Sequence, residues 1–182
     1  MLKKFENLIQ KNLLNNVYVT GFLSFEENGS AEFSAMLDFL YFEFGEQIIE
    51  FQSVEQNSKL RISMVDKVRY EFDKFEDDVV CKSNVSEIVL TKYDSEDNKV
   101  INACFYGLQI NEKSLVCDAL HVKLLNGQDI FIDPTFNFGI NVGGLEQKKY
   151  WEEDYKERIL PRVGSFPKKR HILFLIDNYG DE

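Results

Sequence analysis

The chain has few of the residues that build metal centres and disulfide frameworks. Among its 182 residues are three cysteines, Cys81, Cys104 and Cys117, and two histidines. The odd cysteine count does not suit a paired disulfide framework, and the spacings are not those of a zinc ribbon. We therefore expect no metal site and reduced thiols, which are typical of a cytoplasmic protein. The glycine-rich stretch "GINVGG" lacks the Lys-Ser/Thr that follows a phosphate-binding loop, so we expect no cofactor either.

Positive charge is also scarce. Asp and Glu number 31 against 21 Lys and Arg, which gives a formal net charge of −10. Such a surface repels phosphate backbones, so binding to nucleic acid is disfavoured. A basic protein partner or substrate would be attracted, although a surface that simply keeps the protein in solution explains the same charge.

Long apolar runs are absent, so no segment is predicted to cross a membrane. The first residues are not a signal peptide, because Glu6, Asn7 and Gln10 interrupt any apolar core. Their apolar positions have helical spacing and predict a short amphipathic helix over residues 2–14. We see no repeats and no linker, and expect one domain over residues 1–182. The oligomeric state is left open.

The pattern changes to that of strands from residue 17 onward. Apolar and polar residues alternate or run together in short segments, which are residues 17–25, 35–44, 47–54 and 59–65. Gly45 and Glu46 suit a two-residue hairpin turn. Short consecutive strands with tight turns indicate an antiparallel meander.

Two further helices are expected. Val85, Ile88 and Val89 fall on one helical face, and Asn84 with Glu87 has capping-box spacing, which predicts a helix over residues 83–93 with Cys81 at its start. The β-branched residues of this segment also suit a strand. A C-terminal helix is expected over residues 145–160. The predicted fold is α+β: an antiparallel sheet, as a meander or half-barrel, with a cysteine-bearing helix packed on it and flanking N- and C-terminal helices.

The stretch "DALHVKLLNGQDIFIDPTF", residues 118–136, predicts a hairpin around Asn126-Gly127. A two-residue loop would mix polar and apolar side chains on both faces. A three-residue loop, "NGQ", gives one coherent core face, made of Leu120, Val122, Leu124, Ile130 and Ile132. This register places His121 opposite Asp133 on the other face, with Cβ atoms about 5 Å apart. The pair is either an ordinary cross-strand pair or the orienting half of a catalytic site.

Cys81, His121 and Asp133 together resemble the papain-like and transglutaminase-like superfamily. The likeness covers residues 79–137 and rests on "CKSN" at a helix start, the histidine on a strand, and "IDPT" across the hairpin. It implies a cysteine nucleophile at Cys81, a general base at His121 and an orienting carboxylate at Asp133. Gln52 and Gln56 are candidates for an oxyanion donor by residue type alone.

Two functions follow from these observations. In the first, the chain is a thiol acyl-transfer or amide-hydrolysing domain that acts on a peptide or amide substrate, or a degenerate relative of such a domain. In the second, it is a non-catalytic acidic binding protein, such as a bacterial toxin-immunity protein or an inhibitor of a basic partner. In that case the Cys81 thiol and the His121–Asp133 pair have no catalytic role.

Overall fold

The structure is a computed structural model that describes residues 1–25, 27, 29–69, 79–93, 95–136 and 139–174. Its described strands form two antiparallel sheets, one of seven strands and one of five. The strands of the larger sheet are β1 (Leu14–Phe25), β2 (Ala31–Phe44), β3 (Gln47–Val54), β4 (Lys59–Val65), β5 (Val79–Asn84), β7 (Gln109–Ile110) and β8 (Ser114–Cys117). Those of the smaller sheet are β6 (Val100–Tyr106), β9 (Ala119–Leu124), β10 (Asp129–Phe136), β11 (Gly139–Gly143) and β12 (Lys169–Leu173).

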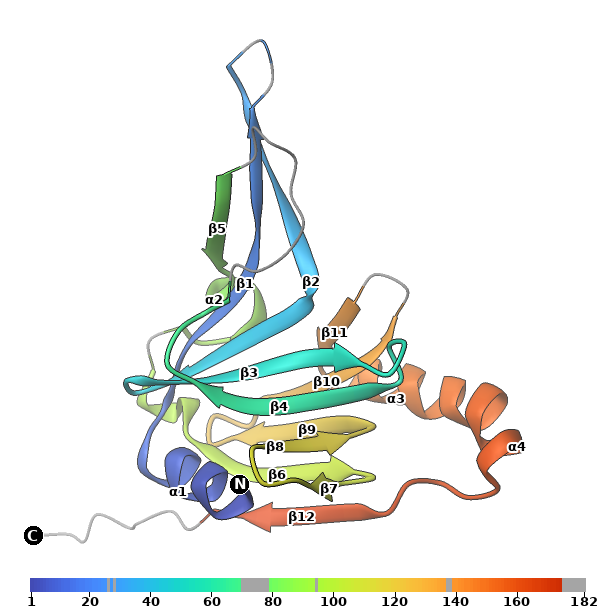
Figure 1. Cartoon of the computed structure of the whole chain (residues 1–182). Helices are drawn as coiled ribbons and strands as arrows, with labels where there is room; N and C mark the ends of the chain where they lie inside the picture. The colour runs from blue at the N-terminus through green and yellow to red at the C-terminus, as the bar shows by residue number, and fades with distance from the viewer. Residues whose placement is uncertain (26, 28, 70–78, 94, 137–138, 175–182) are drawn as a thin grey trace, which may run out of the picture.

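The strand order is β5-β1-β2-β3-β4-β8-β7 in the larger sheet and β11-β10-β9-β6-β12 in the smaller one. The strands β1 to β4 follow one another as an antiparallel meander, as predicted, with the turn of Gly45 and Glu46 between β2 and β3. The α+β class with an antiparallel arrangement and flanking helices is therefore confirmed, although the strands divide into two sheets rather than one (Figure 1).

The helices are α1 (Leu2–Lys11), α2 (Ser86–Val89), the short 3-10 helix η1 (Glu96–Asn98), and α3 (Leu145–Asp154), which continues through one π-helical turn, η2 (Tyr155–Ile159), into α4 (Leu160–Val163). The predicted N-terminal helix forms, and its buried stripe is Leu2, Phe5, Leu8 and Ile9. Phe5 meets Phe105 of β6 edge to face, with ring centroids 5.5 Å apart. The helix thus joins the main apolar core, which contains buried side chains from both sheets.

Helix α3 covers the other face of the smaller sheet. Trp151 is 2% exposed and packs against Tyr106, Phe131 and Tyr155 in a second apolar cluster. The smaller sheet is therefore buried on both faces, between the main core and α3. Phe131 lies under this helix on the side of the hairpin opposite the main core, whereas Lys123 on the same side is exposed.

The predicted helix over residues 83–93 is wrong. Residues 79–84 form strand β5, which pairs with β1, and only Ser86–Val89 is helical. The strand contains the β-branched Val79 and Val80, whereas Ile88 and Val89 belong to the short helix. Two side-chain contacts then fix the corner between strand and helix: Asn84 Oδ1 accepts from Ser86 N at 2.9 Å, and Ser86 Oγ accepts from Val17 N at 2.8 Å.

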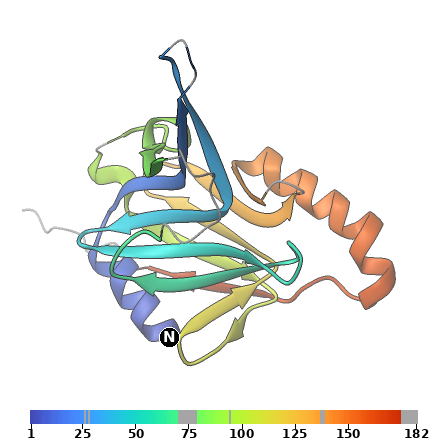
Figure 2. The same ribbon diagram turned by 45° about the horizontal axis from the view of Figure 1, so that its top comes forward.

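The outer parts of three strands form a projection that we call the arm. It comprises residues 20–25 of β1, residues 31–38 of β2, and β5, and it rises above the rest of the molecule (Figures 1 and 2). The arm exists because β2 is longer than β3, whose pairing with β2 ends at Phe39. The register between β1 and β2 shifts between Val19 and Thr20, where β2 has three additional residues and bends away from the body.

Candidate functional site

The hairpin has a three-residue loop, but the loop begins one residue earlier than predicted. Leu124 N donates to Gln128 O at 2.9 Å and Gly127 N donates to Leu124 O at 3.1 Å. The loop is therefore Leu125 to Gly127, with Gly127 in the left-handed conformation at φ +88. His121 consequently lies opposite Phe131, so its predicted pairing with Asp133 is wrong. The predicted core face is confirmed, because both registers place the same side chains on each face.

His121 pairs with Asp129 instead. Its Nε2 lies 2.8 Å from Asp129 Oδ1, and both side chains are largely buried. Burial lowers the pKa of His121, and the charges of Lys148 and Lys123 act in the same direction, against the opposing effect of the Asp129 carboxylate. The imidazole is therefore neutral near pH 7, and the contact is a hydrogen bond between a neutral ring and a carboxylate.

Asp133 is completely buried and has other partners. Its carboxylate accepts from Gln147 Nε2 at 2.8 Å and from Asn141 Nδ2 at 3.2 Å. These bonds connect β10 to β11 and to the first turns of α3. They give Asp133 a clear structural role, which the sequence pattern did not reveal.

Cys81 belongs to the edge strand of the larger sheet, opposite Gly21 of β1, and is partly exposed. His121 and Asp133 belong to the smaller sheet. No hydrogen bond joins Cys81 to either residue in the described part of the chain. Gln52, on β3, and Gln56, in the turn after it, lie on segments that do not pair with β5. The structure therefore does not bring the predicted triad together.

The other two thiols are poor nucleophiles. Burial raises the pKa of Cys104 and, more strongly, that of Cys117. Cys104 Sγ lies 3.5 Å from Nε2 of the exposed His171, but the cysteine itself is 3% exposed. Among the described residues, no group of three or more His, Cys, Asp or Glu is arranged to hold a metal ion.

An apolar groove lies between the arm and the body. Its volume is about 420 Å³. Its lining comes from β1, β2, β5, α2 and β11, and consists of Val19, Phe33, Ala35, Leu37, Phe39, Leu40, Ser83, Val85, Ile88, Val89, Ile140 and Val142. Only Ser83 in this lining is polar. A concave surface of this kind is suited to apolar side chains or apolar ligands.

A second hollow of about 330 Å³ adjoins the groove and shares Ile88, Val89 and Val142 with it. Its remaining walls include Thr91, Gln128 and Asp129, so this end is polar and carries a carboxylate. Ile88 stands between the two spaces and is 84% exposed, which is unusual for a large apolar side chain. The apolar groove therefore opens toward a polar, negatively charged end.

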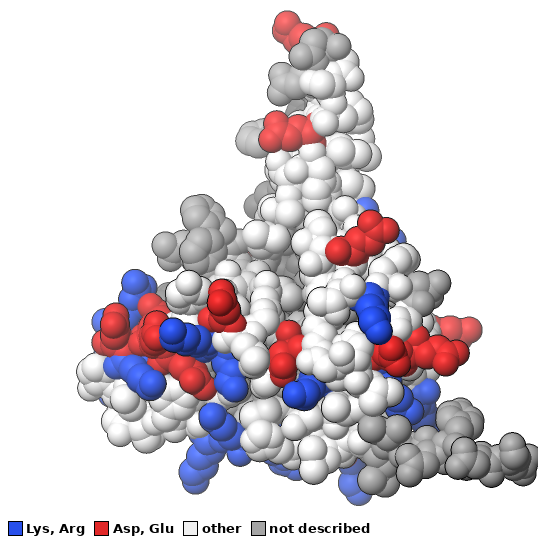
Figure 3. Space-filling model, turned by 180° about the vertical axis from the view of Figure 1, so that it is seen from behind, with Lys and Arg blue, Asp and Glu red and all other residues white. Residues whose placement is uncertain are grey.

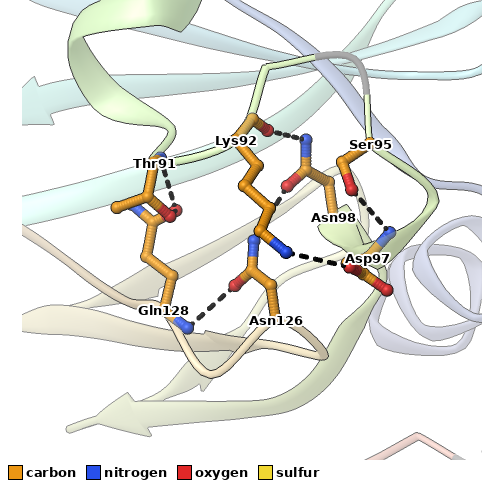
Figure 4. A network of polar contacts seen from close by, with 7 residues as sticks. All are labelled: Thr91, Lys92, Ser95, Asp97, Asn98, Asn126 and Gln128. Carbon is orange, nitrogen blue, oxygen red and sulfur yellow. Dashed lines mark hydrogen bonds and ion pairs between the residues drawn. The ribbon is translucent and has the colours of Figure 1, made fainter.

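A network of polar contacts holds the wall that carries Ile88 (Figure 4). Gln128 Oε1 accepts from Thr91 N at 2.9 Å, and Gln128 Nε2 donates to Val89 O at 2.7 Å. Asn126 Nδ2 donates to Asn98 Oδ1 at 3.1 Å, and Asn98 Nδ2 donates to Lys92 O at 2.8 Å. The hairpin loop is thus bonded to the segment after α2, and the groove has a wall that is held in place.

The arm carries mainly negative charge. Its described charged residues are Glu32, Asp38 and Lys82, and Glu27 lies in the turn between β1 and β2. Lys82 Nζ lies over the Tyr18 ring, 4.0 Å from its centroid. Figure 3 shows acidic groups spaced along a mostly uncharged arm, with most Lys and Arg on the body below. Glu32 and Asp38 alternate along β2 with the residues that line the groove, so these carboxylates lie on the opposite face of the arm.

The sequence contained one signal for this groove. A two-residue turn joins β2 to the shorter β3, so part of β2 must extend beyond its partner.

No family model, curated protein or solved structure matches the chain significantly. Within the described residues, no helix combines the length and apolar character needed to cross a membrane.

Proposed function

We propose that the chain is a non-catalytic binding protein that docks a basic partner protein against the arm and the groove. The observation that carries this proposal is the groove itself: an apolar hollow, with the exposed Ile88 at its end, on an arm whose described charged side chains are mostly carboxylates. Apolar side chains of a partner would supply affinity in the groove, and the carboxylates of the arm would steer a cationic surface toward the arm.

Acyl transfer by a thiol has less support from the geometry. It requires a nucleophile and a base within about 3 Å of each other, or slightly more without substrate. Cys81 and His121 lie in different sheets, and the imidazole is bonded to Asp129 under α3. An inhibitor or immunity protein needs no such contact, and the formal charge of −10 suits a basic target.

The proposal is tested by site-specific photocrosslinking in cells that naturally produce the protein. A photoreactive amino acid replaces Leu37, in the groove, or Leu173, which is 76% exposed on β12. We expect the first position to yield an adduct with one protein rich in Lys and Arg, and the second to yield none.

Competition makes this test specific for the groove. Unlabelled wild-type protein and the Leu173→Asp variant should both suppress the adduct, whereas Ile88→Asp should not. Both substitutions add a carboxylate at a highly exposed position, so they are matched for their effect on folding. Suppression by Ile88→Asp equal to that by Leu173→Asp, or the same adducts from both labelled positions, would refute the proposal.

A further inference from the structure

The arm exposes an unpaired sheet edge. Residues 31–36 of β2 pair with β1, and β3 begins its pairing with β2 only at Phe39. Within the described part of the chain, no strand pairs with residues 31–38 on the side away from β1. Among the described residues, the backbone N–H and C=O groups of residues 31–36 on that side therefore have no strand partner and can accept another strand.

This edge lacks the usual protection against pairing. Proteins commonly place Lys or Pro on an exposed edge strand. The segment 31–38, "AEFSAMLD", contains neither, and its two charges are the carboxylates of Glu32 and Asp38. A long edge of this kind either causes aggregation or serves as a binding site.

The groove lies on one face of the same edge. Phe33 and Ala35 are opposite Leu23 and Gly21 of β1, and cross-strand partners share a face. The groove is lined by Phe33, Ala35 and Leu37. These are alternate residues of one strand, so their side chains lie on the same face. A strand added beside them would direct every second side chain toward the groove and the others away from it.

The lower end of the edge is closed by β11. A Cβ atom added at Gly139 would lie 2.2 Å from Leu37 O, so the two backbones are in direct contact there. Gly139 also has a φ of +119, which other residues rarely adopt. The contact fixes the place where an added strand must stop, directly above the groove.

We propose that an extended segment of the partner, with alternating apolar and basic residues, adds as a strand to residues 31–36 of β2. Its apolar side chains enter the groove, and its Lys or Arg side chains lie near Glu32 and Asp38. The inference rests on the proposed function and specifies how the partner is recognised. Strand addition supplies backbone hydrogen bonds, while the groove and the carboxylates select the side chains.

The test uses a capped synthetic peptide of alternating lysine and valine and the full-length protein. Amide hydrogen exchange is followed by NMR with and without the peptide. We expect alternate amides within residues 31–36 to exchange up to about tenfold more slowly, which corresponds to one added hydrogen bond each. The same peptide methylated on alternate backbone nitrogens should cause no slowing.

Other results would overturn the inference. Equal binding of the methylated and unmethylated peptides would mean that side chains dock without strand pairing, and crosslinking at Leu37 would then still support the proposed function. No slowing with either peptide would also refute strand addition. Protection without peptide that rises with protein concentration, together with a doubled mass, would assign the edge to a second copy of the chain.

A pair of variants provides a second readout. Adjacent residues of a strand direct their N–H groups to opposite sides, so Ala35→Pro and Met36→Pro remove donors from different edges. One variant should lower the melting temperature, because it loses a bond to β1. The other should melt like the wild type and lose peptide binding. If the variant that melts like the wild type also binds the peptide like the wild type, strand addition is contradicted. If both variants unfold, the comparison of the methylated and unmethylated peptides tests strand addition instead.

Discussion

Exposure distinguishes the three cysteines. Cys81 is partly exposed, whereas Cys104 is 3% and Cys117 0% exposed. We predict that iodoacetamide modifies Cys81 alone in the native protein, because the thiolate must reach the reagent and burial raises the pKa of the other two thiols. Mass spectrometry of peptides from the labelled protein gives the rate at each site.

The rate at Cys81 should be unchanged by His121→Ala, since the two residues belong to different sheets. The matched control is His171→Ala, which removes the other histidine. A Cys81 rate that falls only in His121→Ala would show that the two side chains interact, and would restore the thiol mechanism.

His121 should make stability depend on pH. Burial lowers its pKa, so the folded protein binds this proton more weakly than the unfolded chain. Its contribution is therefore fully present above the ordinary histidine pKa of about 6.5 and is lost as the pH falls toward the lower pKa of the folded state. We predict that His121→Gln flattens the fall in unfolding free energy between about pH 7.5 and pH 5.

Urea denaturation at a series of pH values measures this difference directly. The exposed His171 provides the control, and His171→Gln should retain the slope of the wild type. Equal slopes in wild type and His121→Gln would mean that the buried imidazole is not the group responsible.

At the level of the elements, the sequence predicted which face of a strand each side chain occupies better than it predicted which residues pair across strands. The core face of the β9–β10 hairpin was predictable because apolar side chains alternate along it. The loop was predicted one residue too late, which shifts the cross-strand pairing by two residues, although Gly127 could have indicated its position: glycine suits the third position of a three-residue loop. The partner of His121 depends on that single shift, so the candidate triad was sensitive to a detail that hydrophobic pattern does not encode.

The prediction of a helix over residues 83–93 failed for another reason. Helical spacing and strand-forming residues coincide there, and a contact distant in sequence decides between them: Val17 N with Ser86 Oγ. The local sequence pattern likewise did not predict the arm, because the arm depends on which residues of β2 the shorter β3 leaves unpaired. Such information lies in the pairing of whole strands.

The side chain of Gln128 tests how the groove wall is held. It accepts from Thr91 N and Thr91 Oγ1 and donates to Val89 O. We predict that Gln128→Ala lowers the free energy of unfolding by about 1–2 kcal/mol and accelerates hydrogen exchange in residues 86–91. Gln109→Ala, at an exposed position on β7, should stay within about 0.5 kcal/mol of the wild type. Exchange that rises equally throughout the protein would indicate general destabilisation rather than a loosened wall.

At the scale of the whole molecule, apolar residues have two different roles. In the body they are buried, and both sheets and α1 contribute to one core. On the arm many remain accessible: Phe25 is 62%, Val79 51% and Leu37 37% exposed. Apolar surface that the fold does not bury contributes little to stability, so its retention is better explained by binding.

This difference predicts opposite effects for two substitutions of the same kind. Phe5→Ala removes a ring that is 1% exposed and packed on Phe105, and should cost about 3–5 kcal/mol. Phe25→Ala removes a ring at the end of the arm and should change the free energy of unfolding by less than about 0.5 kcal/mol. Urea denaturation measures both values. A large cost for Phe25→Ala would mean that the arm folds its apolar residues into the structure, and would remove the reason to regard it as a binding surface. A small change in the free energy of unfolding, with weaker crosslinking at Leu37 in the same variant, would show that the Phe25 ring contributes to binding and not to folding.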